Sequence, residues 1–511
     1  MNRHDTVSRT ARLLQAVPLA VVAVFFAVPV IAMLGRFARI DSVVDTVVDP
    51  SMRGVWWFTF WQAGASTLLT LVIGVPVAWA VSRHRFRGSG LVSSLVTVPF
   101  FMPAVVIAAG VKSIIPDQPT WGILWAHVVF NVAVVVRVVG PRWSLMDPSM
   151  EDTAADLGAG PLRIFTTVVL PYVSGAVKNA AAIVFVFCFT SFGVIAIIGG
   201  ISRRTVESEV FVQAVSLGDT RTAVSLSLVQ AVVVFTVFVI GARDGSANAE
   251  QFGVAVQPRR VTRHNRRLVA VAVAVPTVVV ATPLVSVVVK SFVVEGSLSL
   301  QGYRWLLDGT TEQVGIDMSR VMVTSVVFAL ACASVTVAFA LVLAFARNTS
   351  GFVSSLTAVP LVVSAVTLGL GLIITFDTPP FDWRGETWLI PVVHVVIALP
   401  LAMRTLTGAV TALPVNLRES AASLGAGPWR TWWRVEMPVL RPAVARAAGM
   451  SAAVSVGEFG ATSFLSRSDS TTIPIAVSQL MGHPGAVMPQ AAFALAALCV
   501  VVFTAVFAAT V

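Results

Sequence analysis

The chain has 511 residues, of which 56% are hydrophobic and 12% charged, with a mean hydropathy of +0.86. A soluble domain carries roughly 25% charged residues, so this composition excludes a soluble globular protein and indicates one embedded in a membrane. The formal net charge of +10 does not indicate nucleic acid binding, because the arginines cluster between apolar segments, where they orient helices in a bilayer.

Twelve apolar segments are long enough to cross a bilayer, which takes about 20 helical residues. The first follows a polar, basic tail and is longer than a signal-peptide core, so we interpret it as a retained helix. In chain order the segments are 13–34, 57–81, 91–114, 121–140, 172–199, 222–241, 268–290, 322–346, 352–374, 388–407, 440–465 and 490–510.

Charged residues between these segments alternate largely as the positive-inside rule requires. The basic clusters fall on one side and the acidic stretches 41–49, 308–317 and 377–386 on the other. This pattern predicts that both termini lie in the cytoplasm. The exceptions are Arg36, Arg39, Arg203 and Arg204, which fall on the outer side.

The two halves of the chain repeat each other at a fixed offset of 267 residues. Matching positions include Trp121 and Trp388, His127 and His394, and Gly158-Ala159-Gly160-Pro161 and Gly425-Ala426-Gly427-Pro428. Upstream the offset is 261, as for Pro99 and Pro360. A polar, basic segment at 242–267 separates the halves and is predicted to be a cytoplasmic linker.

We therefore predict an all-α polytopic membrane protein with about 12 transmembrane helices in two tandem six-helix halves, residues 1–241 and 268–511. Each half holds an even number of spans, so both halves have the same orientation. This is a parallel repeat, with a pseudo-twofold axis along the membrane normal.

A long polar segment follows the fourth span of each half, at residues 148–171 and 415–438. We expect a short helix, a tight turn and a second short helix. Asp152 and Glu419 are expected in or near the first turn, where an anion complements the helix dipole. Glycines with positive φ end the first helix, and prolines begin the elements that follow. The residues concerned are Gly158, Pro161 and Pro171, and Gly425, Pro428 and Pro438.

The pairs Ala154-Ala155 and Ala421-Ala422 leave a surface that another protein can approach closely. With Asp152, Gly158 and Pro171, and with Glu419, Gly425 and Pro438, they resemble the Glu-Ala-Ala loop of permeases from bacterial ABC importers. The resemblance covers both halves. It implies two coupling helices that insert into clefts of a cytoplasmic ABC ATPase, present in two copies. Asp152-Thr153 departs from the pattern, which predicts weaker or asymmetric docking in the first half.

The resemblance further implies an extracytoplasmic solute-binding protein as partner, transport by alternating access, and location in the bacterial inner membrane. The chain has no Gly-Lys-Ser/Thr phosphate-binding loop, so we expect a permease without enzymatic activity. No cofactor is expected on this chain, and ATP and Mg²⁺ are expected on the partner ATPase. The cysteines Cys188, Cys332 and Cys499 have no metal-ligand spacing, so no metal is expected either.

The fused double permease resembles the thiamine and the ferric-iron importers. The stretch Phe187–Gly193 is closer to thiamine permeases, whereas Gly457–Thr462 resembles a stretch shared with iron and oxyanion permeases. The resemblance leaves both substrates open.

Polar residues inside the spans are candidates for the translocation path, because ionisable groups there are costly. Glu458 and its repeat mate Ser191 are the candidates, with interhelical hydrogen bonding as the open alternative. His127 and His394 mark equivalent points of spans four and ten. With no carboxylate expected nearby, we interpret them as helix-packing or hydrogen-bonding residues rather than metal ligands.

An ion- or proton-coupled secondary transporter with two parallel six-helix halves is the alternative function. It would not need two docking helices at one repeat position, and carboxylates within the spans are few. A membrane enzyme is a third possibility, but no Ser/His/Asp, His-Glu-x-x-His or paired-carboxylate constellation supports it.

Overall fold

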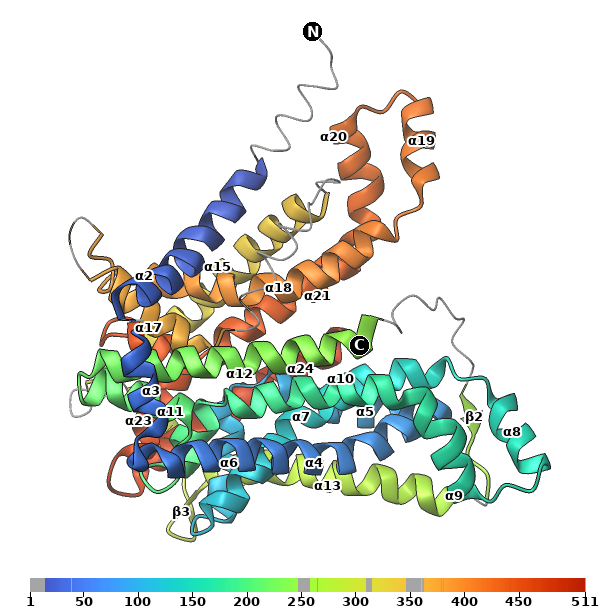
Figure 1. Cartoon of the computed structure of the whole chain (residues 1–511), viewed down its shortest axis with the longest axis horizontal. Coiled ribbons are helices and arrows are strands. Elements are labelled where there is room, and N and C mark those ends of the chain that lie inside the picture. Colours follow the sequence, from blue (N-terminus) through green and yellow to red (C-terminus); the bar gives the residue numbers. More distant parts are fainter. Residues whose placement is uncertain are drawn as a thin grey trace. The chain divides into compact units, whose positions relative to one another are not determined.

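The computed structural model describes residues 14–37, 39–246, 258–263, 265–308, 315–345, 360, 363–377, 379 and 381–510. Helices dominate these residues, and two short β-pairs accompany them (Figure 1). The chain forms two compact units. Unit 1 combines the chain up to Ala38 with Gly309–Ala476, and unit 2 combines Arg39–Asp308 with Val477–Ala509.

Unit 2 holds most elements of the first half together with the beginning and the end of the second. Its long helices and their companions are α3 (Ile40–Val48), α4 (Arg53–Arg83), α5 (Ser89–Phe101), α6 (Ala104–Ile114), α7 (Pro119–Ser144), α8 (Pro148–Asp156), α9 (Pro161–Ile164), α10 (Leu170–Phe189), α11 (Val206–Phe211), α12 (Thr220–Ser246), α13 (Arg266–Ser291), α14 (Gln301–Asp308) and most of α24 (Val487–Thr510). Short 3-10 or π-helical turns are η2 (Pro50–Met52), η3 (Phe165–Val169), η4 (Ile195–Gly199) and η5 (Val212–Ser216). The strands are β1 (His84–Arg85), parallel to β2 (Arg259–Arg260), and β3 (Val293–Val294), antiparallel to β4 (Ser297–Leu298).

Unit 1 holds the first helix of the chain and the middle of the second half. Its elements are η1 (Ala23–Ala27), α2 (Val28–Phe37), α15 (Met318–Phe345), α17 (Ala365–Thr375), α18 (Leu389–Thr411), α19 (Val415–Ser423), α20 (Pro428–Thr431), η8 (Trp432–Glu436), α21 (Met437–Gly457) and α22 (Gly460–Leu465). Within this unit α15, α18 and α21 pack on one another. The helix α23 (Ile473–Gly482) begins in unit 1 and ends in unit 2.

Nine helices among the described residues are long and apolar enough to cross a membrane, and there are ten if the bent pair of α5 and α6 is counted as one span. This confirms an all-α polytopic membrane protein. Of the two other predicted spans, 352–374 lies partly outside the described residues and is represented by α17. The other, 440–465, corresponds to α21 and α22, and α21 carries Arg441 and Arg446.

Several predicted spans are not single rods, contrary to the boundaries that hydropathy indicated. Helices α5 and α6 meet at 105°. Pro103 drives Met102 into an extended conformation (φ −77°, ψ 152°), which ends α5. The predicted span 172–199 stops at Phe189, and 440–465 breaks after Gly457. Hydropathy does not register these breaks because the residues on both sides of each are apolar.

The sequence repeat is also a repeat of secondary structure. The helices α8, α9, η3 and α10 begin at residues 148, 161, 165 and 170, and α19, α20, η8 and α21 begin 267 residues later, at 415, 428, 432 and 437. Helices α6 and α17 are related by the upstream offset of 261. The internal duplication is therefore visible in the fold as well as in the sequence.

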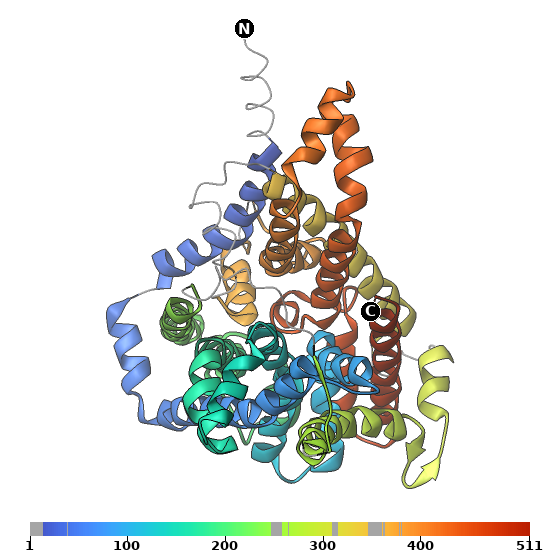
Figure 2. The same ribbon diagram turned by 90° about the vertical axis from the view of Figure 1, so that its right-hand side faces the viewer.

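The first helix of each half packs outside its own half. In unit 1, α2 packs on α17 of the second half. In unit 2, α13 packs on α4, α5 and α6 of the first half, and it runs beside α4 in both views (Figures 1 and 2). The compact units therefore do not coincide with the predicted halves 1–241 and 268–511, and only parts of the linker 242–267 are described.

Two glycines at repeated positions allow α13 to pack closely on α6 and α2 to pack closely on α17. A Cβ on Gly110 of α6 would lie 2.4 Å from the Pro283 carbonyl oxygen of α13. Its repeat mate Gly371 of α17 faces Met33 and Pro29 of α2, and a Cβ there would lie 2.9 Å from the Met33 sulfur. The absence of a side chain at both positions lets a neighbouring backbone come close.

Three of the four exceptions to the charge rule make specific contacts within the units. The Arg36 guanidinium donates to the Ile374 carbonyl near the end of α17 (2.7 Å). Arg203 donates to the Thr120 hydroxyl (3.0 Å), and Arg204 pairs with Glu209 at the start of α11 (3.3 Å). Arg36 thus joins α2 to α17, and Arg203 joins the turn after η4 to α7, roles that do not depend on orientation in the membrane.

We expect Gly110→Ala to destabilise unit 2 by about 1–3 kcal/mol, because the new methyl group meets backbone that cannot move without separating α6 from α13. Gly371→Ala should cost less, since the flexible Met33 side chain can yield. Gly64→Ala in α4 is the control, because a Cβ there meets nothing within 4 Å. Thermal unfolding of the purified chain measures all three, and equal midpoints would contradict the close packing.

Candidate functional site

The segments that follow α7 and α18 have the predicted helix-turn-helix form. Gly158 has φ 83° and Gly425 has φ 77°, the left-handed conformation. In the first copy the Ala159 N–H donates to the Ala154 carbonyl (3.0 Å) and the Gly158 N–H to the Ala155 carbonyl (2.9 Å). The second copy repeats both bonds. This pairing is the Schellman motif, so the predicted helix-ending role of both glycines is confirmed.

Prolines begin the next helices as predicted. Pro161 and Pro428 occupy the first positions of α9 and α20. Pro171 and Pro438 lie at the start of α10 and α21, but no break precedes them. The π-helical turns η3 and η8 come immediately before these prolines. A widened turn accommodates a residue that has no N–H to donate to the preceding turn.

The second helix of the first hairpin and the span behind it are therefore joined without a hinge. Pro161–Phe189 runs as one helix of 29 residues, through α9, η3 and α10. In the second half, α19 and α20 form the corresponding hairpin, drawn in orange (Figure 1).

The surface of the two hairpins differs in part from the prediction. Asp152 and Glu419 are the fifth residues of α8 and α19, outside the first turn, so the helix dipole does not explain them. Of the alanine pairs, Ala155 and Ala422 are exposed, whereas Ala421 packs inward with 7% exposure and Ala154 is half-buried. One alanine of each pair is therefore exposed.

A leucine before each glycine is the most exposed apolar residue of the tip. Leu157 is 83% exposed and Leu424 is 88% exposed. Both hairpins therefore present an exposed leucine at the same repeat position.

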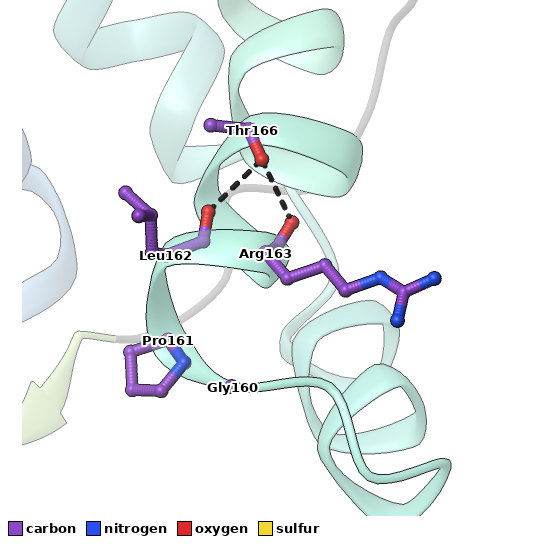
Figure 3. A pocket seen from close by; sticks show the side chains of 5 residues that line it. All are labelled: Gly160, Pro161, Leu162, Arg163 and Thr166. Atoms are coloured by element: carbon purple, nitrogen blue, oxygen red, sulfur yellow. Dashed lines mark hydrogen bonds between the residues drawn. The ribbon is translucent and has the colours of Figure 1, made fainter.

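The two hairpins also differ behind the tip. In the first, Gly160, Pro161, Leu162, Arg163 and Thr166 line a surface hollow, with the Thr166 hydroxyl donating to the Leu162 carbonyl at 3.0 Å (Figure 3). In the second, Trp429, Trp432 and Trp433 occupy the equivalent region, with ring centroids 5.1–6.4 Å apart. The second hairpin therefore offers a larger aromatic surface.

Sequence reasoning missed an ion pair that holds each hairpin. Glu151 of α8 pairs with Arg83 at the end of α4 (2.9 Å), and Arg83 also donates to the Met146 carbonyl (2.6 Å). In α19 the same repeat position is Arg418, which pairs with Glu436. The charge reversal between Glu151 and Arg418 was visible in the repeat, but their distant partners were not.

The two repeated histidines form hydrogen bonds between helices, which confirms that interpretation. His127 of α7 bonds the Ser66 hydroxyl of α4 (3.0 Å), and His394 of α18 bonds the Ser455 hydroxyl of α21 (2.8 Å). The expectation that no carboxylate lies nearby is wrong for His394, because Glu458 lies 3.5 Å from its Nε2. The broken helix brings that carboxylate back toward α18.

Glu458 caps a helix from the break after α21. Its carboxylate accepts the N–H groups of Ala461 (2.9 Å) and Thr462 (2.8 Å) and the Thr462 hydroxyl. The side chain is buried, and its carboxylate satisfies free N–H groups at the start of α22. Ser191 lies in the equivalent break after α10 and is half-buried. The role of either residue in a translocation path stays a prediction.

Among the described residues, no group of three His, Cys, Asp or Glu side chains could hold a metal ion. His127, His394 and Glu458 thus form hydrogen bonds within the spans, whereas the exposed, duplicated feature is the hairpin.

Residues 252–511 match the family described as the binding-protein-dependent transport system inner membrane component. The chain belongs to this family. It is the transmembrane permease subunit of an ABC importer and a multi-pass protein of the bacterial inner membrane.

Relatives of known designation extend the similarity over most of the chain. A thiamine transport system permease protein of Brucella abortus is 26% identical over 456 residues, covering 83% of this chain and 81% of the relative. The protein of that designation in Escherichia coli is 24% identical over 506 residues, covering 91% and 90%. A sulfate transport system permease protein of Synechococcus elongatus is 28% identical over 191 residues, covering 34% and 69%.

We expect Glu458→Ala to destabilise the chain by about 2–4 kcal/mol, because it leaves buried N–H groups without an acceptor. Glu458→Gln keeps one acceptor oxygen and should cost less. Thermal unfolding measures both variants, with Ser191→Ala at the equivalent break as the control. Uptake per inserted molecule then separates the roles. Full uptake in Glu458→Gln would remove Glu458 from the path, whereas normal stability with slow uptake would place it there.

Proposed function

We propose that the chain carries thiamine inward across the membrane by alternating access, receiving it from an extracytoplasmic binding protein. Two copies of a cytoplasmic ABC ATPase drive the cycle by docking on the hairpins α8–α9 and α19–α20. In this proposal the chain hydrolyses no ATP and binds no cofactor, while ATP and Mg²⁺ belong to the partner ATPase.

The observation that carries this proposal is the pair of hairpins, whose helices begin and whose turns are bonded at an offset of 267 residues. Each ends in a Schellman turn and presents an exposed leucine. In the first half the hairpin continues into the span behind it as one helix. Such a rod can convert the approach of two ATPase subunits into movement of the spans. A secondary transporter has no use for two matching docking elements, so this alternative is less well supported.

The position of the hairpins supports an orientation for the chain. If α8 and α19 face the cytoplasm, the basic clusters at Arg83–Arg87 and Arg259–Arg267 face it too, as the positive-inside rule requires. Both termini are then cytoplasmic.

The substrate proposal rests on the relatives. The thiamine permeases align over 83% and 91% of this chain, whereas the sulfate permease aligns over 34% of it. Ferric iron was the other substrate considered from the sequence, and it becomes an outcome of the substrate test.

We expect Gly425→Asp to reduce co-purification of the ATPase and solute uptake by about tenfold, because it strains a positive-φ turn and adds a charge at the tip. Gly158→Asp should have an equal or smaller effect. Gly385→Asp in an exposed loop of unit 1 is the control, because that glycine has no positive φ and a Cβ there meets nothing within 4 Å. Normal assembly of both hairpin variants would exclude docking at these turns.

We expect the complex, reconstituted in liposomes with its binding protein, to take up labelled thiamine and to hydrolyse ATP faster when thiamine is present. The permease without its ATPase should give only the background rate of hydrolysis. Ferric iron and sulfate serve as competing solutes in the same assay. Stimulation by ferric iron in place of thiamine would identify ferric iron as the substrate. ATP hydrolysis by the pure permease would refute the assignment of hydrolysis to the partner ATPase.

A further inference from the structure

The interdomain linker approaches the first hairpin through a strand. Residues Arg259–Arg260 form β2, which pairs in parallel with His84–Arg85, the strand β1 directly after α4. This places residues 259–260 of the linker beside α8 (Figure 1). All of these residues belong to unit 2.

The linker contacts α8 through a two-pronged ion pair. The two terminal guanidinium nitrogens of Arg259 donate to the two carboxylate oxygens of Asp152, at 3.1 and 2.6 Å. Both side chains are about half exposed, at 51% and 57%. Arg259 holds the pKa of Asp152 below its usual range, and the nearby Arg83 acts in the same direction. The carboxylate is therefore ionised at neutral pH, and the pair is lost only as the pH falls through that lowered pKa.

A second contact fixes the linker on the other side of the strand. The Asn265 side-chain oxygen accepts the Thr262 N–H (2.8 Å), so the Asn265 amide nitrogen faces His84 and donates to its Nε2 (3.0 Å). The His84 ring packs edge-on against Trp79, with centroids 4.5 Å apart. Burial, followed by the charge of Arg83, lowers the pKa of His84, which keeps the imidazole neutral and able to accept this bond.

Charge makes this docking specific for the first hairpin. Asp147, Glu151 and Asp152 give the start of α8 three carboxylates, and all three attract the Arg259 guanidinium. The equivalent positions before and in α19 are Pro414, Arg418 and Glu419. An arginine from the linker would find one carboxylate and one repelling cation there. The departure of the first half from the family pattern, at Asp152, thus coincides with the residue that the linker binds.

We propose that Arg259 is a positioning residue for ATPase coupling, holding the first coupling helix α8 to β1 through Asp152. This inference rests on the proposed docking of an ATPase at the hairpins. The linker then acts as a clasp, defined by Arg259, Thr262 and Asn265, that stiffens one hairpin and not the other. It compensates in the first half for the weaker family motif.

The clasp is tested on the full-length permease in lipid nanodiscs by hydrogen exchange of the peptide covering 148–156. Arg259→Gln and Asp152→Asn should each speed exchange about two- to fivefold, the range expected of an exposed ion pair. The double variant should add nothing, because either change alone breaks the pair. Arg260→Gln, in the same strand but outside the ion pair, is the control, and the peptide covering 415–423 should be unchanged throughout. Normal exchange in Arg259→Gln, or additive effects in the double variant, would overturn the clasp.

Its role in coupling is tested in the reconstituted complex by the number of solute molecules transported per ATP hydrolysed. Arg259→Gln should lower this ratio at least about twofold, Arg259→Lys should lie between it and the wild type, and Arg260→Gln should match the wild type. Faster exchange with an unchanged ratio would overturn the positioning role. Normal co-purification of the ATPase with Gly158→Asp and Gly425→Asp would instead refute the docking proposal. The exchange result would then still stand.

Discussion

A backbone inside a bilayer has no water to bond, and each unpaired N–H or C=O costs several kcal/mol. Several interruptions of a helix among the described residues are accompanied by a cap or a side-chain hydrogen bond that reduces this cost. Glu458 takes the free N–H groups of α22, the Ser364 hydroxyl takes that of Thr367 at the start of α17, and Pro103, which has no N–H, precedes α6. At the end of α13, Gln490 donates to the carbonyls of Ser291 and Ser299. The exposed hairpins, by contrast, pair their last carbonyl groups through Schellman turns, which are set by backbone geometry rather than by the bilayer.

The sequence predicted the fold class, the repeat and the turn geometry because these depend on local composition and backbone preference. It predicted the breaks poorly. Pro76 lies inside α4 and Pro276 and Pro283 lie inside α13 without ending either helix, so a proline in an apolar run does not by itself mark a break. The carboxylate beside His394 was missed for the same reason, since a straight helix would have carried Glu458 away from it. Partner choice was also invisible, because a hydropathy profile cannot tell which helix a glycine such as Gly110 faces.

For the candidate site, what could be predicted was what lies within one turn of the chain. Gly158, Gly425 and the prolines behind them set backbone angles, and these expectations were confirmed. The ion pairs Arg83–Glu151 and Arg418–Glu436 join residues 68 and 18 positions apart, and that of Arg259 with Asp152 spans 107. No local pattern encodes such distances. Only the comparison of the halves, which shows the charge reversal at Glu151 and Arg418, could have drawn attention to them.

The first helix of each half packs on helices of the other half, and this has a consequence for how the protein is made. The bond from Arg36 to the Ile374 carbonyl joins residues 338 positions apart, so the first helix is synthesised long before its partner α17 exists. At roughly 5–20 residues per second, the wait is about 20–70 s. During that time α2 must reside in the lipid, or be held by the insertion machinery, with the surface that will meet Gly371 uncovered and an arginine near its end. Biogenesis of this permease therefore includes a stage in which the first span is inserted but has no helix to pack on. A ribosome that stalls in the linker leaves this span permanently without its packing partner.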